Sequence, residues 1–322
     1  MSSRDCLVVM YHYVRDSAAT SFPAIRALVP ELFERQLDWL QAQYTVIDLE
    51  RLEAALNGGE PLPPEAAMLT FDDGLVDHYA TVLPALRRRG LRGTFFLSED
   101  ACRDSPRMLA VHKVHYLLAH LGADAFGHAV LDACAAGVSQ GRAREVFGRD
   151  QWDDGGERAI KHLINHELPF SEAERVLELL FARHLGSSAD FARSLYLDAA
   201  MIREMAAAGM TFGYHTRTHR MLARLSVEQQ EDELRGGVEW IRALTGQATA
   251  TFCYPWGGPH TYTGDTLRII RQAGYSLAFN TVRRRLRQDD QRYELPRIDT
   301  RDLPPYTAAE PPPAPSFSAE EA

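Results

Sequence analysis

Two patterns of hydrophobic and polar positions alternate along this chain. Short apolar runs, typical of buried strands, are separated by longer segments whose apolar residues recur every three or four positions, as in amphipathic helices. The runs predicted to be strands are 6–11, 45–47, 66–71, 93–97, 210–214, 248–253, 275–279 and 293–298. The segments predicted to be helices are 30–41, 49–58 behind the N-cap Asp48, 76–89, 198–208, 226–244 and 263–273. This alternation predicts βα units around a mainly parallel sheet, either open or closed into a barrel.

Capping residues support several of the predicted helix boundaries. Ser226 with Gln229 forms a capping box at the start of one helix, and Ser171 with Glu174 predicts a second box. Gly209 is a typical glycine just beyond a helix C-terminus.

The stretch from about 101 to 197 does not follow the alternation. It has mostly helical periodicity and is too long for a loop, so we expect an inserted helical subdomain. The remainder of 1–303 is predicted to form one barrel-like domain. Residues 304–322 are mostly Pro, Ala and Glu, and we predict that they form a disordered tail.

Composition excludes several classes of protein. Of the 322 residues, 45% are hydrophobic and 25% are charged, an ordinary balance for a globular domain. The net charge of −9 and the lack of a basic face argue against nucleic-acid binding. The one basic run, 283–287, is short and is interpreted as a solvated surface segment. No apolar run reaches the roughly 18 residues that span a membrane. The first residues lack the apolar region of a signal peptide, so a cytoplasmic protein is expected.

The cysteines do not predict a metal site of their own. No two of them form a CxxC pair, and nothing suggests a disulfide framework. The four cysteines are Cys6, Cys102, Cys134 and Cys253.

Two adjacent carboxylates, Asp72 and Asp73, follow the predicted strand 66–71 and precede Gly74. Strand ends are where α/β folds place their chemistry. One carboxylate of such a pair can hold a metal ion while the other moves a proton. Because Asp-Gly is also a strong turn signal, the pair alone does not distinguish a catalytic site from a turn.

Two histidines, His215 and His219, follow the predicted strand 210–214. At i and i+4 they lie on one face if the segment is helical, and they can share a metal ion. The residue after His215 is Thr rather than Glu, so this is not the HExxH motif of zinc peptidases. Two unrelated polar histidines in a loop are the alternative interpretation.

The positions of these residues add information. His12 and the segment 253–258 also follow predicted strands, and in a parallel barrel the carboxyl ends of the strands meet on one face. One acidic residue and two histidines with an open position for water are a common catalytic-metal arrangement. A second carboxylate beside the activated water would complete a hydrolase.

Five segments of the chain resemble motifs of the polysaccharide deacetylase superfamily, also called carbohydrate esterase family 4, the chitooligosaccharide deacetylase homology domain. They are 70–74 and 215–219 for its first two motifs, 252–257 for a Tyr-Pro-aromatic-Gly variant of the third, and 10–14 and 295–298 for the opening and closing strands of one branch. The resemblance spans about 1–99 and 198–303.

The resemblance implies a distorted (β/α)7 barrel and the hydrolysis of N-acetyl groups from sugars. It assigns Asp73, His215 and His219 to a divalent metal ion and makes Asp72 the general base. The metal would polarise the acetyl carbonyl and lower the pKa of its water towards ~7. Zn²⁺ suits these ligands, although iron, cobalt, nickel or manganese would also fit. The residues expected to bind substrate are Tyr254, Pro255, Trp256, Gly257 and Arg297.

The chain departs from the family pattern in two places. Cys253 stands where family members often have an Arg that orients the catalytic Asp, and Arg297 could supply that charge from another strand. The late Leu-x-His motif, source of the general acid, is missing, and no histidine follows His260. His12 is the first candidate for the acid. The alternative is that His12 packs against or orients Asp72.

Other histidines are weaker candidates for a catalytic role. His78 and His260 lie in the predicted barrel domain. His112, His115, His162 and His166 lie in the expected insertion, where no acidic pair at a strand end accompanies them. We interpret the second group as amphipathic helix surface, although this region could instead cap the active site and select substrate.

Three functions are compatible with these observations. The first is a metal-dependent deacetylase acting on an N-acetylated sugar or glycan precursor, with Asp72 as base and a backbone N–H near Trp256 stabilising the oxyanion. The second is a hydrolase of a small amide or cyclic imide on the same scaffold. The third is a barrel that binds glycan without catalysis. Nucleic-acid and membrane-spanning partners are not expected, and the sequence leaves the oligomeric state open.

Overall fold

The computed structural model describes residues 5–134, 140–141 and 152–305, and it divides the chain into two compact units. The first, here called the barrel unit, contains Met1–Arg15, Ala27–Asp104 and Leu195–Ala322. The second, here called the helical unit, contains Asp16–Arg26 and Ser105–Ser194. Nearly all of the tail expected at 304–322 lies outside the described residues.

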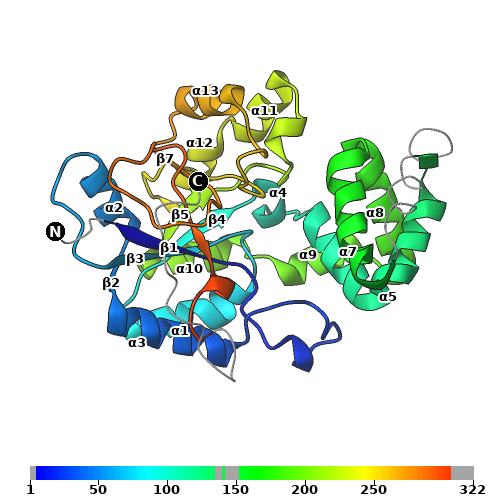
Figure 1. Ribbon diagram of the computed structural model, residues 1–322, viewed down its shortest axis with the longest axis horizontal. Helices are drawn as coiled ribbons and strands as arrows, with labels where there is room; N and C mark the ends of the chain where they lie inside the picture. The colour runs from blue at the N-terminus through cyan, green and yellow to red at the C-terminus, as the bar shows by residue number, and fades with distance from the viewer. Residues whose placement is uncertain (1–4, 135–139, 142–151, 306–322) are drawn as a thin grey trace. The chain divides into compact units, whose positions relative to one another are not determined.

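The strands of the barrel unit form one curled parallel sheet with helices around it (Figure 1). The strands are β1 (Cys6–Tyr11), β2 (Thr45–Ile47), β3 (Ala66–Phe71), β4 (Thr94–Leu97), β5 (Thr211–Tyr214), β6 (Thr251–Cys253), β7 (Leu277–Phe279) and β8 (Ile298–Asp299). Their order is β7-β6-β5-β4-β3-β1-β8, and β2 also pairs with β3. The predicted α/β architecture with a parallel sheet is confirmed.

The helices of the barrel unit follow the predicted alternation with the strands. They are α1 (Pro30–Gln43), α2 (Leu49–Leu56), α3 (Leu83–Arg89), α4 (Glu99–Cys102), α10 (Ala199–Ala207), α11 (Val227–Leu234), α12 (Gly237–Thr245) and α13 (Gly264–Gln272). Asp48 caps α2 by accepting a hydrogen bond from the Arg51 backbone N–H at 3.0 Å. Helices α1 and α3 lie side by side (Figure 1), and Arg88 and Arg89 of α3 pair with Glu34 of α1.

Two neighbouring strands, β1 and β3, are buried along their whole length. They pair in register, with Tyr11 beside Phe71 at their carboxyl ends. The rings of Tyr11 and Phe71 stack at 5.1 Å, and Phe71 stacks on Phe95 of β4 at 4.7 Å. This packing fixes the strand ends, so His12 and Asp72, the next residue of each strand, emerge next to each other.

The helix predicted over 226–244 is wrong as a single element. The Ser226–Gln229 capping box is present, but the chain breaks at Gly236, which has a φ of 78°, and divides into α11 and α12. A side chain at Gly237 would lie 2.3 Å from the Tyr275 hydroxyl, so the start of α12 packs against the tyrosine too closely for any larger residue.

Two other local predictions are also wrong. Helix α8 begins at Phe170 with Pro169 at the N-cap position and no side-chain cap, so Ser171 lies inside the first turn and cannot form the predicted box. The strand predicted over 293–298 is reduced to β8, preceded by a single bridge from Leu295. Pro296 between them has no N–H to donate to a neighbouring strand.

The helical unit contains four named helices among its described residues. They are α5 (Ala110–Ala133), α7 (Trp152–His162), α8 (Phe170–His184) and α9 (Ser188–Leu195), the last ending at the boundary of the unit, and Figure 1 shows α5, α7 and α8 packed together. Phe22, from the separate segment Asp16–Arg26, packs edge-on against Tyr116 and Phe191 at 4.8 and 5.8 Å. These contacts explain why that segment joins this unit, for which the sequence gave no signal.

The histidines of the helical unit do not share one environment. His112 is completely buried, so the expected surface position is wrong for this residue. The rings of His162 and His166 stack at 5.1 Å, and His162 Nε2 lies 3.2 Å from a Glu167 carboxylate oxygen.

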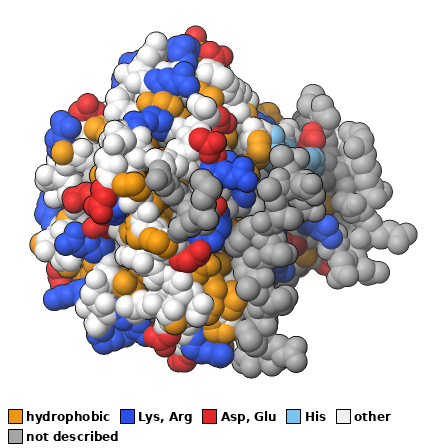
Figure 2. Space-filling model, turned by 60° about the vertical axis from the view of Figure 1, so that its left-hand side comes forward, with side chains coloured by type: hydrophobic (Ala, Val, Ile, Leu, Met, Phe, Trp, Pro, Cys, Tyr) orange, Lys and Arg blue, Asp and Glu red, His pale blue; other side chains and the backbone are white. Residues whose placement is uncertain are grey.

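The face drawn in Figure 2 carries Lys and Arg side chains interspersed with Asp and Glu among its described residues. None of the helices in the described part of the chain has both the length and the hydrophobicity needed to cross a bilayer.

Candidate active site

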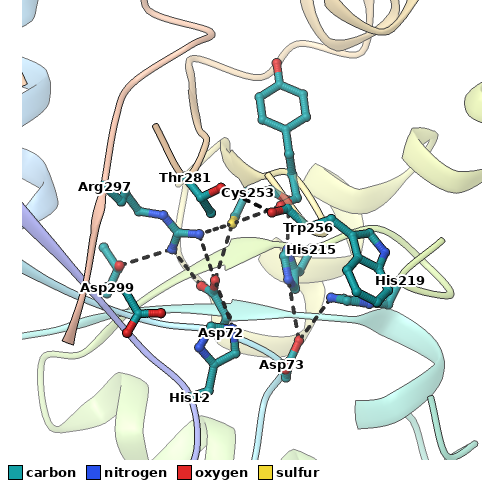
Figure 3. A network of polar contacts seen from close by, with 12 residues as sticks. His12, Asp72, Asp73, His215, His219, Cys253, Trp256, Thr281, Arg297 and Asp299 are labelled. Carbon is teal, nitrogen blue, oxygen red and sulfur yellow. Dashed lines mark hydrogen bonds and ion pairs between the residues drawn. The ribbon is translucent and has the colours of Figure 1, made fainter. Parts of the chain in front are cut away.

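The carboxyl ends of β1, β3, β5 and β6 bring the predicted site residues together (Figure 3). His12 follows β1, Asp72 and Asp73 follow β3, His215 follows β5, and Cys253 ends β6. Because these strands run parallel in one sheet, their polar residues share one edge of it.

Backbone strain is concentrated in this part of the molecule. Four of the five non-glycine residues with positive φ among the described residues lie here: Asp73 (75°), Thr216 (63°), His219 (60°) and Trp256 (68°). Such conformations cost of the order of 1–3 kcal/mol each and persist only where the surroundings enforce them. The concentration of strain indicates that the fold holds these side chains in fixed positions.

The glycine of the Asp-Asp-Gly sequence is required by the fold. Gly74 has a φ of +64°, and a Cβ at this position would lie 2.4 Å from the Cys102 sulfur. The segment is therefore a tight turn, and the same turn carries two buried carboxylates, Asp72 and Asp73. The Asp-Asp-Gly sequence can therefore be both a turn and part of a catalytic site.

Asp73, His215 and His219 form one compact group, here called the Asp73 cluster. Asp73 Oδ1 lies 3.5 Å from His215 Nε2 and 3.3 Å from His219 Nε2. His215 Nδ1 lies 2.8 Å from the Cys253 carbonyl oxygen, so Nδ1 donates its proton there and Nε2 is the nitrogen that faces Asp73. One ligand atom from each residue lies within 4.8 Å of the others, and the set of two nitrogens and one oxygen fits a divalent cation.

The loop that carries the two histidines is anchored on both sides. The His215 backbone N–H donates to the Leu97 carbonyl at 2.9 Å, and the Ser98 hydroxyl donates to the His215 carbonyl at 2.9 Å. Further along, the Thr218 N–H donates to the buried Glu233 carboxylate at 2.8 Å. The Thr216 hydroxyl accepts the His219 N–H at 2.9 Å, which holds the second histidine in place.

Asp72 belongs to a second group, here called the Asp72 cluster, formed with Thr70, Cys253 and Arg297. Arg297 donates two parallel hydrogen bonds of 2.8 Å to the two oxygens of Asp72. It also donates to the Thr70 hydroxyl at 3.1 Å, to the Cys253 sulfur at 2.8 Å and to the Asn280 carbonyl at 3.1 Å. All five N–H donors of the guanidinium are therefore used inside the protein.

The ion pair sets the charge of Asp72. Burial alone would raise the pKa of this carboxyl, but the adjacent Arg297 guanidinium outweighs burial and lowers the pKa to about 2. Asp72 is consequently ionised at any pH near neutrality, although it is buried.

Asp72, His215 and Cys253 are also close enough to share a cation, but their surroundings oppose it. The Arg297 guanidinium lies 2.8 Å from both Asp72 and the Cys253 sulfur and would repel a positive ion. Burial raises the pKa of the Cys253 thiol, so it stays protonated and is a poor ligand. The Asp73 cluster is therefore the better metal site.

Arg297 enters the site from the segment just before β8, whereas Cys253 belongs to β6. Nη2 of Arg297 contacts the Cys253 sulfur, so the small side chain at position 253 leaves space for the guanidinium. The positive charge that family members often carry at position 253 is thus supplied beside Asp72 by Arg297, from the segment before β8.

The three histidines considered for proton donation lie in different surroundings. His12 Nε2 lies 3.9 Å from Asp72, and its side chain is 41% exposed. His78 is fully buried, burial lowers its pKa to about 4, and its Nε2 lies 3.1 Å from the His12 carbonyl oxygen. His260 is exposed next to Gly258. Of the three, His12 is the one that lies beside Asp72 and has a partly exposed side chain.

Among the five residues expected to bind substrate, only Trp256 has a partly exposed side chain. Its ring lies 5.8 Å from the His219 ring. Tyr254 is buried and donates its hydroxyl to the Tyr293 carbonyl at 2.7 Å. Thr281, for which the sequence gave no signal, fixes the loop because its N–H donates to the Gly257 carbonyl at 3.0 Å and its hydroxyl to the Trp256 carbonyl at 3.2 Å.

Comparison with known proteins agrees with the motifs. The family model for polysaccharide deacetylases matches residues 59–114 and 171–278. A segment of 83 residues, 25% of this chain, is 34% identical to the poly-beta-1,6-N-acetyl-D-glucosamine N-deacetylase of Escherichia coli (strain K12). The chain spans only 12% of the length of that protein.

Solved structures of related fold are similar over almost the whole chain. The deacetylase PplD of Streptococcus pyogenes, solved in complex with acetate, has a TM-score of 0.57 at 17% identity, with 92% of both chains covered. IcaB from Ammonifex degensii has a TM-score of 0.56 at 18% identity, with 91% of both chains covered. The predicted distorted (β/α)7 barrel is confirmed.

Proposed function

Because this chain belongs to the polysaccharide deacetylase family, we propose that it is a metal-dependent hydrolase that removes N-acetyl groups from an N-acetylated sugar or glycan. The observation that carries this proposal is the division of two adjacent carboxylates between two clusters. Asp73 faces two histidines, whereas Asp72 is kept ionised by Arg297. A deacetylase needs both arrangements side by side.

In the proposed enzyme, Asp73, His215 and His219 hold the divalent cation. Zn²⁺ suits the ligand set, and iron, cobalt, nickel or manganese ions also fit. When bound, the ion would polarise the acetyl carbonyl and acidify a water molecule. The hydrogen bond from His215 Nδ1 to the Cys253 carbonyl supports this assignment because it leaves Nε2 as the ligand atom.

Asp72 is the general base of the proposed reaction. It takes the proton of the attacking water while the oxygen of that water bonds to the acetyl carbon. Arg297 holds both carboxylate oxygens, so it acts as a positioning residue for the base. A backbone N–H near Trp256 would stabilise the negative charge that develops on the carbonyl oxygen.

His12 is the proposed general acid. When the C–N bond breaks, the amine nitrogen needs a proton, and His12 is the partly exposed histidine beside Asp72. The competing role, in which His12 only orients Asp72, is supported by the same distance of 3.9 Å. Substrates with different leaving groups separate the two roles, because only the acid role depends on the basicity of the leaving group.

The substrate class rests on the relatives. The Escherichia coli relative is named for its action on poly-beta-1,6-N-acetyl-D-glucosamine, and this supports an N-acetylhexosamine for the present chain. The partly exposed Trp256 beside His219 offers an aromatic face at which a sugar ring can pack.

The direct test is release of acetate from N-acetylglucosamine oligomers by the purified protein loaded with Zn²⁺. We expect turnover that disappears with chelator and returns when metal is added. Hydrolysis of small amides or cyclic imides alone would support the alternative hydrolase. Glycan binding without any hydrolysis would show a non-catalytic barrel.

A further inference from the structure

The segment that carries His12 is held from one side by two consecutive residues that the proposed mechanism does not use. Asp77 and His78 lie just after the Asp-Asp-Gly turn, and both reach the chain immediately beyond β1. All of these residues belong to the barrel unit.

Asp77 binds the far end of this segment. Its buried carboxylate accepts the Val14 backbone N–H at 2.9 Å. It also forms an ion pair with Arg15, whose Nε lies 2.8 Å from Asp77 Oδ2 and whose Nη2 lies 2.6 Å from Asp77 Oδ1. The Arg15 N–H in turn donates to the Leu28 carbonyl at 3.0 Å. The backbone two and three residues after His12 is therefore fixed.

His78 binds the near end of the segment at His12 itself. Its imidazole is completely buried and lies beside the stacked rings of Phe71 and Phe95, at 5.6 and 5.5 Å. Burial keeps the ring neutral, so the nitrogen that faces the His12 carbonyl at 3.1 Å is the protonated donor.

The second ring nitrogen of His78, Nδ1, has no hydrogen-bond partner among the described residues. Burying a polar atom without a hydrogen-bond partner destabilises the folded protein. A phenylalanine would fill the same aromatic pocket without that cost. Histidine at position 78 therefore stabilises the fold less than phenylalanine would. What histidine adds is the hydrogen bond to the His12 carbonyl.

We propose that His78 is a positioning residue for His12, holding its backbone so that the imidazole stays beside Asp72 and the leaving nitrogen. This inference rests on the proposed role of His12 as general acid. The His12 side chain is 41% exposed and its contact with Asp72 is long, 3.9 Å, so its ring depends on the backbone for its place. A proton donor displaced by a fraction of an ångström loses much of its effect.

The test compares His78→Phe with His78→Gln. Phenylalanine keeps the aromatic packing and removes the donor, whereas the glutamine amide can donate to the His12 carbonyl from a similar position. We expect His78→Phe to lower kcat on N-acetylglucosamine oligomers about tenfold at an unchanged KM, and His78→Gln to recover most of that loss.

A second substrate distinguishes positioning of the acid from general damage to the site. An aryl acetate releases a phenolate that leaves without a proton, so it does not need the acid. His78→Phe should hydrolyse an aryl acetate at the wild-type rate. Tyr275→Phe is the matched control, because it removes another buried hydrogen bond to a backbone carbonyl, that of Leu234 at 2.9 Å.

Three outcomes would overturn the inference. Equal losses on the amide and the aryl acetate would show a structural role for His78. A structural role would also follow if His78→Phe changed kcat no more than Tyr275→Phe does when both variants lower Tm by a similar amount. Failure of His78→Gln to recover activity, in a protein as stable as wild type, would exclude the hydrogen bond. If wild-type protein releases no acetate from any substrate, the proposed function fails instead.

Discussion

The two clusters of the site use adjacent residues of one turn in different ways. The Asp73 cluster is built from two short sequence motifs, and its ligand atoms face one another directly. The Asp72 cluster is built from single residues brought from β3, β6 and the segment before β8, and a guanidinium lies at its centre. One cluster suits a cation and the other repels it. Neighbouring carboxylates can therefore do different chemistry when their partners differ in charge.

The largest expected effect is on the Asp73 cluster. His219→Gln should lower turnover at least about a thousandfold and remove bound metal from the purified protein, because one of three ligands is lost. Metal analysis and acetate release on the same sample provide the check. Thr218→Ser, on the same loop, keeps the hydroxyl that binds Glu233. It is the control and should retain both bound metal and turnover. A variant without His219 that still holds stoichiometric metal would mean that the ligand set is different.

Arg297→Met should affect the Asp72 cluster alone. We expect kcat to fall about a hundredfold while the metal content stays at the wild-type level, because the base loses its orientation. Without the guanidinium, the pKa of the buried Asp72 should be higher than in wild type, so the rate should start to fall at a higher pH. The measurement is a profile of kcat/KM against pH. Loss of metal in this variant would contradict the separation of the two clusters.

The same ion pair predicts how stability depends on pH. The folded-state pKa of Asp72, about 2, lies below its ordinary value of 3.8. The pair therefore stabilises the fold above that ordinary value, and its contribution is lost as the pH falls towards the folded-state value. Unfolding measured between pH 5 and pH 2 should show this loss in wild type, whereas Arg297→Met should lack it.

His12→Asn should have an effect that depends on the substrate. Turnover of an N-acetylated sugar should fall by about a hundredfold, within the range of general acid catalysis, while an aryl acetate should be hydrolysed almost normally. Comparison of the two rates in one preparation makes the check independent of how much protein is folded. Equal losses on both substrates would support the alternative role, in which His12 orients Asp72.

The smallest expected effect concerns the loop that carries Trp256. Thr281→Val removes the hydroxyl that binds the Trp256 carbonyl and should lower the free energy of unfolding by about 1 kcal/mol. We also expect a several-fold rise in KM with little change in kcat, because the loop holds the partly exposed indole of Trp256. Thr281→Ser keeps the hydroxyl and should behave as wild type. Unchanged stability and KM in the valine variant would show that the loop does not depend on this contact.

The contrast between the clusters also explains what the sequence could reveal. The Asp73 cluster lies in two segments of five residues, 70–74 and 215–219, and the resemblance of these segments to family motifs predicted its members. The partners of Asp72 are separated from it by up to 225 positions along the chain, and only folding shows that Arg297 binds it with two hydrogen bonds. The sequence suggested Arg297 as a substitute for the missing arginine, but it gave no signal for Thr70 as a partner.

The fold predictions succeeded for long apolar runs and failed at helix boundaries. The buried strands were predicted well because long apolar runs fix them, as in β1 and β3. The helix expected over 226–244 is interrupted at Gly236, which has a φ of 78°, and the next residue, Gly237, packs closely against Tyr275. The capping box expected at Ser171 does not form because the N-cap lies two residues earlier, at Pro169.

The most direct test of the central claim, that the two carboxylates have separate roles, is a metal analysis of Asp72→Asn and Asp73→Asn alongside their turnover. We predict that Asp72→Asn keeps one metal ion per chain and loses at least about a thousandfold in kcat, whereas Asp73→Asn loses both metal and turnover. Loss of metal from Asp72→Asn, or turnover retained without Asp72, would contradict the account.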